Sequence, residues 1–314
     1  MPWYFWVSLV FAVILFLTFL ASYATYRIAF YSNRKTPEDI YDIPIGEQYE
    51  EEKERMISLI EEMSKVPFER VYTTSRDGLK LSGRYYQVRD EAPFVLQVHG
   101  YKGTAVRDFC GGNKFAREEG YNSIVIDHRA HGESEGKTIA FGIQERYDVL
   151  CWVEYILQRF GKDTPVYIYG ISMGAATALL AASLGLPKNV KGIVADCPYS
   201  SPEEIIGKAC VEMGVSPKLA MPFLRLGARV FGGFTLKGVS VAEEVKKAKI
   251  PLLLIHGEDD LLVPCEMSQR IFENYAGKKT LKLFPKSGHG ISYIVHTAEY
   301  EESLRQFIRE VETR

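Results

Sequence analysis

A serine flanked by glycines lies between a short apolar run and a run of small, helix-forming residues. Residues 166–169 are apolar, Gly170-Ile171-Ser172-Met173-Gly174 follows, and the small residues continue to Ala182. This G-x-S-x-G spacing is typical of a sharp strand-to-helix turn that lifts a nucleophilic serine hydroxyl clear of a sheet. Glycines leave room where such a strand and helix nearly touch. Since an ordinary Gly/Ser turn would give the same pattern, the rest of the chain must distinguish the two.

The N-terminal segment has a different composition. Residues 1–26 contain no charged side chain and residues 3–24 are almost wholly apolar, which is long enough for a helix to cross a hydrocarbon core of ~30 Å. Aromatic residues gather at both ends, as they do at membrane interfaces. A signal peptide would carry a basic residue before its apolar region, whereas the first here is Arg27. A buried core helix is the other alternative. We expect a single retained transmembrane anchor over residues 1–30.

The next residues suggest an orientation and a connection. Arg27, Arg34 and Lys35 all follow the apolar segment, so the positive-inside tendency places the main domain on the cytoplasmic side. Pro37 and Pro44 favour a linker over residues 31–46. Residues 47–66 have apolar side chains at spacings of three and four, which predicts an amphipathic helix. These side chains are Met56, Leu59, Ile60 and Met63.

Composition excludes several classes of protein. The net charge of −2 provides no basic excess with which to bind nucleic acid. The five cysteines are widely spaced and form no C-x-x-C pair, so neither a zinc site nor a disulfide framework is indicated.

The main domain, residues 67–314, alternates strand and helix patterns. The predicted strands cover residues 93–98, 121–127, 166–169, 190–196, 250–256 and 280–284. Asp77-Gly78 between two β-like runs adds a hairpin. The alternation predicts an α/β fold with a mostly parallel sheet and helices on both faces. Residues 200–249 interrupt it with short, proline-broken apolar helices. We expect a helical cap over the active-site edge; a plain helical layer on the sheet is the alternative.

The loops that follow the predicted strands carry the polar residues, at the edge where such sheets bind ligands. A serine nucleophile needs a base, and the base needs a carboxylate. His289 lies between glycines after the last strand, whereas the rival His296 falls within a predicted helix. Asp260 lies at the turn of its loop and is favoured over Asp259.

Two backbone amides are candidates for an oxyanion hole. Tyr101 follows the strand that ends in His99-Gly100, and Met173 follows the predicted nucleophile. We expect His99 to buttress its loop rather than to act as a base. His128 and His131 lie beside carboxylates, but they lack a third metal ligand at a convincing spacing, so a hydrogen-bonded turn is the better interpretation.

Five motifs occur in order along the chain. They are His99-Gly100, Asp127-His128-Arg129-Ala130-His131-Gly132-x-Ser134-x-Gly136, Gly170-Ile171-Ser172-Met173-Gly174, His256-Gly257-x-x-Asp260-x-x-Val263-Pro264 and Gly288-His289. Over residues 71–311 they resemble the α/β-hydrolase superfamily. More narrowly they resemble the bacterial serine aminopeptidase-like or acyl-esterase-like hydrolases, some of which carry an N-terminal membrane segment. The resemblance implies Ser172, Asp260 and His289 as a catalytic triad, with the amides of Tyr101 and Met173 as oxyanion donors.

These features together predict a membrane-anchored serine hydrolase that cleaves carboxylic esters of acyl or lipid-like character, with no metal or organic cofactor. The motifs are shared by esterases, lipases, thioesterases and peptidases, so cleavage of amides or thioesters, or acyl transfer, is the enzymatic alternative. A non-catalytic interaction protein that keeps the fold is the alternative from another class.

Overall fold

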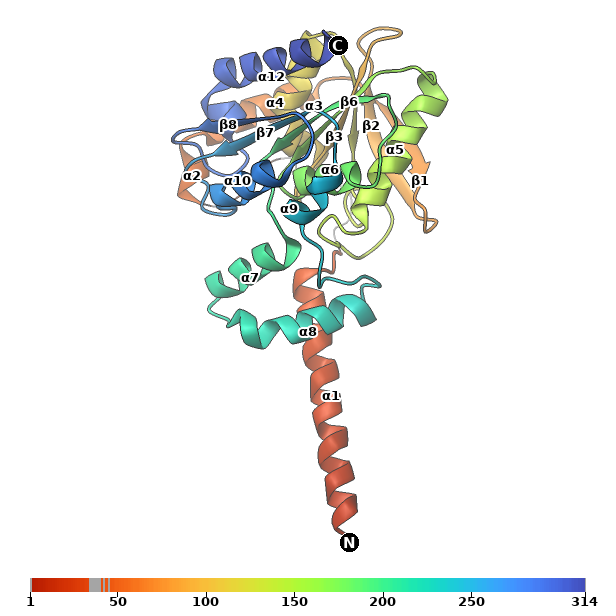
Figure 1. Ribbon diagram of the computed structural model, residues 1–314, viewed down its shortest axis with the longest axis vertical. Helices are drawn as coiled ribbons and strands as arrows, with labels where there is room; N and C mark the ends of the chain where they lie inside the picture. The colour runs from red at the N-terminus through yellow and green to blue at the C-terminus, as the bar shows by residue number, and fades with distance from the viewer. Residues whose placement is uncertain (1, 34–40, 42, 45, 314) are drawn as a thin grey trace.

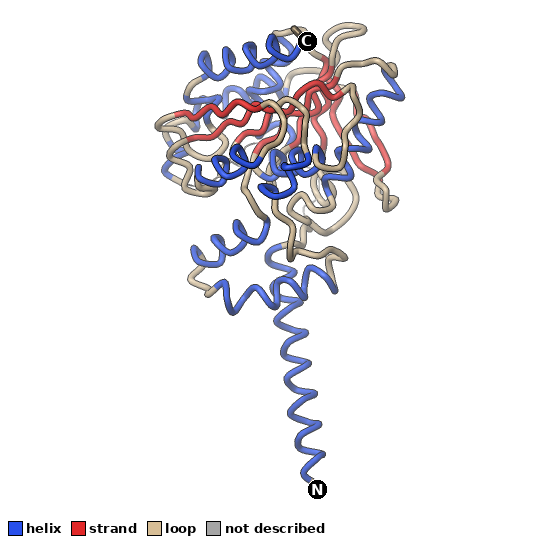
Figure 2. Tube along the Cα trace, viewed as in Figure 1, coloured by secondary structure: helices blue, strands red, loops and turns tan. Residues whose placement is uncertain are grey.

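The computed structural model describes residues 2–33, 41, 43–44 and 46–313. Part of the predicted linker, residues 34–40, 42 and 45, lies outside the described residues, and so do Arg34 and Lys35, on which the predicted orientation partly rests. A long helix, α1 (Trp3–Ala29), projects from one end of an α/β body, and the C-terminus lies at the opposite end (Figures 1 and 2).

An eight-stranded sheet forms the centre of the body, in the order β1-β2-β4-β3-β5-β6-β7-β8. The strands are β1 (Glu69–Thr74), β2 (Lys80–Tyr86), β3 (Phe94–Val98), β4 (Asn122–Ile126), β5 (Val166–Ile171), β6 (Val190–Asp196), β7 (Leu252–Gly257) and β8 (Lys279–Phe284). The pairs β1–β2 and β2–β4 are antiparallel and the other pairs are parallel. The predicted hairpin and the mostly parallel sheet are therefore confirmed.

Helices cover both faces of this sheet (Figure 1). On one face lie α3 (Lys53–Ser64), α4 (Ala105–Glu118), α11 (Ser292–Val295) and α12 (Thr297–Glu312). On the other lie α5 (Glu145–Phe160), α6 (Met173–Ala182), α9 (Val241–Glu244), a 3-10 turn η1 (Val245–Lys247) and α10 (Cys265–Asn274). Both faces of the central strands are therefore buried, which explains their continuous apolar runs.

The helix predicted over residues 47–66 is two helices. A short one, α2 (Glu47–Glu50), is separated by a turn from α3. In α3, Met56, Ile60 and Met63 are buried, as their helical spacing predicts, and they join the core between α3 and α4.

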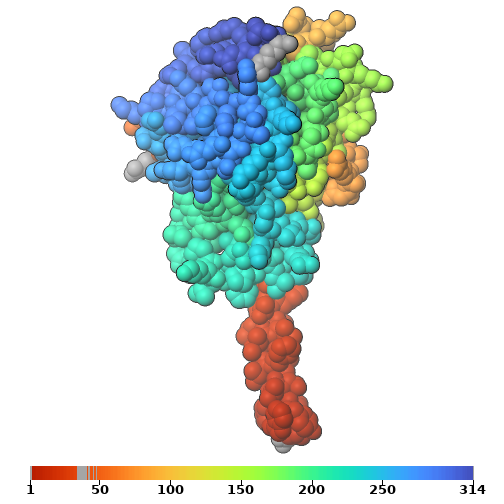
Figure 3. Space-filling model, in the orientation of Figure 1, coloured from red at the N-terminus to blue at the C-terminus, as the bar shows by residue number. Residues whose placement is uncertain are grey.

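Two further helices lie apart from the layers, on the side from which α1 projects (Figure 1). They are α7 (Pro202–Glu212) and α8 (Pro217–Val230), and both fall within the region predicted as a cap. The space-filling view shows α1 emerging directly beneath this pair (Figure 3).

The inner end of α1 is built into the body. The Tyr26 hydroxyl shares a hydrogen bond of 2.8 Å with Thr138 Oγ1. Phe30 is fully buried with its ring edge-on to Phe141 and Phe234. Ile139 N donates to Phe30 O at 2.7 Å. Because side chain and backbone both attach it, α1 is held in a fixed position relative to the sheet.

Candidate active site

Ser172 occupies the turn between β5 and α6 in a conformation that L-residues rarely adopt, with φ 55° and ψ −117°. Such a conformation costs about 1–3 kcal/mol and persists only where the surroundings impose it. Its backbone N–H donates to Asp196 O at 2.8 Å. A Cβ on Gly174 would overlap the carbonyl of Val98, and one on Gly170 would overlap the backbone of Gly174. Both glycines are therefore required for the close approach of strand and helix.

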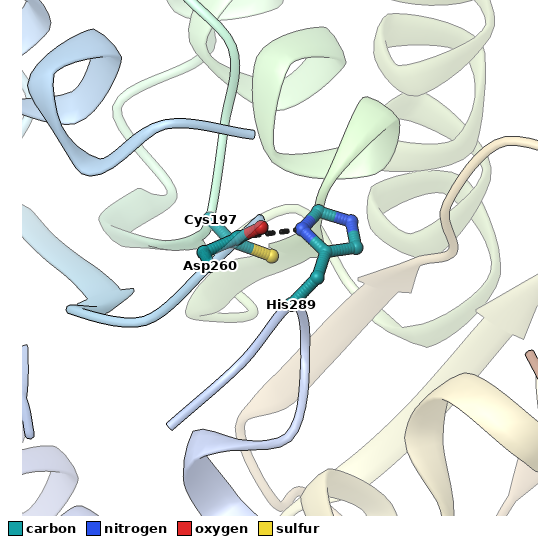
Figure 4. A group of neighbouring side chains, drawn as sticks. All are labelled: Cys197, Asp260 and His289. Atoms are coloured by element: carbon teal, nitrogen blue, oxygen red, sulfur yellow. Dashed lines mark hydrogen bonds and ion pairs between the residues drawn. The ribbon is translucent and has the colours of Figure 1, made fainter. Parts of the chain in front are cut away.

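A chain of hydrogen bonds runs from Ser172 through His289 to Asp260. Ser172 Oγ lies 2.8 Å from His289 Nε2, and His289 Nδ1 lies 2.7 Å from Asp260 Oδ2 (Figure 4 shows the second contact). The rival residues lie elsewhere: Asp259 is exposed, and His296 Nε2 contacts Pro285 O instead. The geometry thus joins the three residues favoured by the sequence and neither rival.

The Asp260 carboxylate is fixed by contacts of its own. Oδ1 accepts hydrogen bonds from Leu262 N at 2.9 Å and Val263 N at 2.8 Å. Burial alone would raise the pKa of Asp260, but the nearby imidazoles of His289 and His256 outweigh burial and hold it below the usual range. The residue therefore stays ionised and can orient His289 and stabilise an imidazolium.

His256 supports Asp260 and was not predicted. It is fully buried; its Nε2 lies 2.8 Å from Val263 O and 3.2 Å from Asp260 Oδ2, and its Nδ1 lies 2.6 Å from Ser268 Oγ. Its place at the end of β7, just before the Asp260 loop, was the available signal.

The loop that carries His289 is held by the short helix α2, which precedes the hydrolase domain in the sequence. Tyr49 Oη donates to His289 O at 3.1 Å, and Gln48 Oε1 accepts from His289 N at 3.2 Å. These residues lie about 240 positions away in the sequence, outside every recognised motif. Nothing in the sequence indicated this role.

The proposed oxyanion donors lie on either side of Ser172. Met173 is the first residue of α6, where helical N–H groups lack intrahelical partners. Tyr101 lies in the loop after β3, and a Cβ on the adjacent Gly100 would lie only 3.4 Å from Ser172 Cβ. Gly100 N donates to Asp108 Oδ2 at 2.8 Å, which ties this loop to the start of α4.

Two of the histidines near this loop brace backbone amides with their rings. His99 Nε2 accepts from His128 N at 3.0 Å, and His131 Nε2 accepts from Lys102 N at 3.1 Å. Burial lowers the pKa of His99 and, more strongly, that of His128, whose two ring nitrogens are buried without a hydrogen-bond partner among the described residues. A neutral His99 that braces a backbone amide fits its expected buttressing role.

Within the described residues, the one group with metal-ligand spacing is Cys197, Asp260 and His289 (Figure 4). Asp260 and His289 already bind each other. Burial, followed by the charges of Asp196 and Asp260, raises the pKa of the Cys197 thiol well above its usual range, which disfavours the thiolate that a metal needs. The group therefore fits a hydrogen-bonded cluster better than a metal site.

Two cavities meet at Ser172. One, of about 320 Å³, is a mixed cavity: Tyr49, Arg107, Asp108 and Asp196 contribute polar atoms, but most of its lining surface is apolar. The other, of about 380 Å³, is apolar and runs between α7, α8 and the inner end of α1. Its wall includes Ile28, Ile206, Met213 and Leu224. Both volumes lie in the range of ligand-binding sites.

A buried carboxyl group lines the mixed cavity. Asp196 ends β6, and its Oδ2 accepts from the Tyr300 hydroxyl at 2.8 Å. Burial raises the pKa of Asp196 to about 6, against the opposing effect of the Tyr300 hydrogen bond.

An eight-stranded, mostly parallel sheet with a strained serine between β5 and α6 defines the α/β-hydrolase class. Two family models agree with this assignment: the alpha/beta hydrolase fold model matches residues 93–227, and the model described as serine aminopeptidase, S33, matches residues 225–293. The chain belongs to the α/β-hydrolase superfamily, and it is an enzyme of the serine hydrolase type.

Individual relatives are more distant. The protein YqkD of Bacillus subtilis is 26% identical over 276 residues, which is 88% of each chain. The lysophosphatidylserine lipase ABHD12 of Xenopus tropicalis is 27% identical over 70% of this chain, and the match spans 58% of that lipase. Among solved structures, the esterase Pf2001 of Pyrococcus furiosus matches with a TM-score of 0.65 and 24% identity, over 80% of this chain and 92% of the esterase.

Proposed function

We propose that this protein is a membrane-anchored carboxylic ester hydrolase whose substrate combines one long acyl chain with a polar alcohol portion. One observation carries the proposal. Ser172, hydrogen-bonded to His289, lies where an apolar cavity meets a mixed cavity that carries charged side chains. An ester bound there would place its acyl chain on one side and its alcohol on the other, with the carbonyl at Ser172.

The reaction would proceed by an acyl-enzyme. Ser172 Oγ attacks the ester carbonyl while His289 Nε2 takes the hydroxyl proton. Asp260 holds the Nδ1–H and stabilises the imidazolium. The tetrahedral intermediate collapses, the alcohol leaves with the proton from His289, and water attacks the acyl group by the same steps in reverse. The amides of Tyr101 and Met173 would donate to the oxyanion, and the position of each beside Ser172 supports this assignment.

The comparisons support an ester substrate of lipid character. The relative ABHD12 is named a lysophosphatidylserine lipase, and a lysophospholipid carries a single acyl chain and a charged headgroup. If a substrate of this kind binds here, its acyl chain would lie in the apolar cavity. The mixed cavity, with Arg107 and Asp108 in its lining, would take the headgroup.

The anchor and the domain boundaries are part of the same proposal. α1 is long and apolar enough to cross a membrane, and nearly all of its most apolar 18-residue stretch is exposed. We assign residues 1–30 to the anchor, 31–66 to the connecting segment, 67–314 to the hydrolase domain and 200–249 to its cap insertion. Within that insertion α7 and α8 form the cap itself, whereas α9 and η1 pack on the sheet. The basic residues after α1 support a cytoplasmic hydrolase domain. Protection of this domain from external protease in sealed inverted vesicles would contradict that orientation.

A substrate series on the full chain in detergent micelles tests the proposed function. We expect p-nitrophenyl esters to be cleaved faster as the acyl chain lengthens from four to twelve carbons, and a lysophospholipid to release fatty acid. The S33 description of one family model makes aminoacyl amides the informative comparison. Faster cleavage of amides than of esters, or full activity in Ser172→Ala, would contradict the proposal.

A further inference from the structure

The outer face of α8 is apolar, and its side chains are exposed to solvent. Leu219, Pro222, Leu226 and Val230 are exposed and recur at spacings of three and four, so they share one side of the helix. Leu219 is 72% exposed and Val230 56%. The opposite side, with Leu224, Gly227 and Ala228, is buried. A continuous apolar stripe on a water-exposed surface marks an interaction site.

The basic side chains of α8 favour a partner with an anionic surface. Its sequence contains Lys218, Arg225 and Arg229 and no acidic residue. Arg225 is paired with Glu203 on α7, whereas Lys218 and Arg229 are exposed beside the apolar stripe. An apolar face flanked by basic residues is the composition of helices that lie in the interface of an anionic bilayer.

The position of α8 on α1 places it at such an interface. α8 lies across α1 (Figure 1), and the two backbones approach so closely at Gly227 that a Cβ there would overlap Ser22 O. Phe231, just after α8, packs edge-on against Phe19 and Tyr23 of α1. Every residue of α1 from Trp3 to Leu17 is exposed. That protruding part is only ~22 Å long at ~1.5 Å per residue.

A hydrocarbon core of ~30 Å is thicker than the protruding part of α1. If α1 spans the membrane, the hydrocarbon must therefore extend to the level of Ser22, where α8 crosses. The apolar stripe of α8 then lies at the boundary between acyl chains and headgroups. Its Lys218 and Arg229 lie at the depth of lipid phosphates.

The apolar cavity opens at the same level. Thr25, Ile28 and Ala29 of α1 form one wall, and Met213 and Val215 at the end of α7 form part of another. Met213 and Val215 are themselves 64% and 44% exposed, which gives the cavity an apolar rim. The Tyr101 hydroxyl donates to Ala29 O at 3.0 Å, so the loop beside Ser172 is joined to the membrane helix.

We infer that α8 docks on the bilayer surface, and that an acyl chain passes from the same leaflet into the cavity between α1 and α7 without crossing water. This inference rests on the anchored hydrolase proposed above, since it takes α1 as the spanning helix. α1 is then both the tether and a wall of the acyl site.

The direct test measures the depth of α8 in full-length protein reconstituted into vesicles of phosphatidylcholine and phosphatidylglycerol. Leu219→Cys, labelled with an environment-sensitive fluorophore, should be quenched by lipids that carry a nitroxide near the headgroup. Leu184→Cys is the matched control, because Leu184 is an exposed leucine in the loop before β6, at the opposite edge of the sheet. The native cysteines can also take up the fluorophore, so the unsubstituted protein is labelled in the same way to measure their signal. Equal quenching at positions 184 and 219 would overturn the inference.

A kinetic test distinguishes failure of docking from failure of the proposed function. In Leu219→Asp/Val230→Asp, hydrolysis of a lysophospholipid embedded in the vesicles should fall at least ~10-fold, because two apolar side chains no longer enter the interface. Hydrolysis of water-soluble p-nitrophenyl butyrate should stay within ~2-fold, since neither residue is among those that line the two cavities at Ser172. Leu184→Asp should change neither rate. An unchanged rate on vesicle lipid in the double variant would overturn the inference that α8 docks on the bilayer. Ser172→Ala tests the hydrolase proposal separately, because this variant should lose both activities.

Discussion

Replacement of Gly227 by alanine tests the junction of α1 and α8. The added Cβ would lie 2.4 Å from Ser22 O and 3.2 Å from Tyr26 Cβ. Ordinary contact begins near 3.4 Å, so α8 must move away from α1 by ~1 Å, and such overpacking costs about 1–3 kcal/mol. Alanine also gains about 1 kcal/mol over glycine inside a helix, which hides part of the cost.

Gly207→Ala on α7 removes that ambiguity. A Cβ at Gly207 would meet Pro217 Cβ at 3.9 Å and Met221 Cε at 4.0 Å, which is ordinary van der Waals contact. Both variants gain the same helix propensity, so their difference isolates the overlap. We expect Gly227→Ala to be about 1–3 kcal/mol less stable than Gly207→Ala, or roughly 2–10 °C in melting temperature.

The assay is thermal unfolding of the full chain in detergent, followed by circular dichroism, together with kcat/KM for four-carbon and twelve-carbon esters. Because α1 and α8 both border the apolar cavity, Gly227→Ala should lower kcat/KM for the longer ester more than for the shorter. Equal melting temperatures for the two variants, with equal chain-length profiles, would refute the close packing on which this reasoning depends.

Three further outcomes follow from the site. Asp260→Asn should lower kcat about 10⁴-fold, because the amide cannot fix the required tautomer of His289, and the exposed Asp259→Asn should leave kcat within ~2-fold. Tyr49→Phe removes a hydrogen bond to His289 O worth about 1 kcal/mol, so kcat should fall ~5-fold with little change in KM; a change confined to KM would contradict a positioning role. Asp196 has a folded-state pKa of about 6, above its unfolded value of about 3.9, so its ionisation weakens the fold as pH rises through that window. Asp196→Asn should therefore stabilise the fold by up to ~3 kcal/mol at pH 7.5, measured as a higher melting temperature, and by much less at pH 4; equal effects at both pH values would contradict the raised pKa.

Local pattern predicted the fold because each signal lay within one element. The alternation of buried strands with amphipathic helices specified the parallel sheet, and Gly170 and Gly174 around Ser172 specified the turn. Order along the chain then singled out His289. The choice of Asp260 over Asp259 rested on loop position alone, and the structure adds that only Asp260 is buried with its carboxylate toward the imidazole.

Contacts between distant segments were not predictable in this way. The short helix α2 carries Gln48 and Tyr49 to the His289 loop, but a four-residue helix has no periodicity to reveal a partner. The run that predicted an anchor gave no sign that Thr25 and Ile28 also form the wall of a cavity. A transmembrane pattern reports hydrophobicity, and which side of the helix meets protein depends on the cap that packs against it.

The proposed function depends on Ser172 as the nucleophile. Treating full-length protein with a fluorophosphonate and mapping the digested peptides by mass spectrometry tests this directly. We expect one stoichiometric adduct on the peptide that contains Ser172, with parallel loss of ester hydrolysis, and no adduct in Ser172→Ala. Labelling of a different residue, or full hydrolysis by protein whose Ser172 is completely modified, would contradict it.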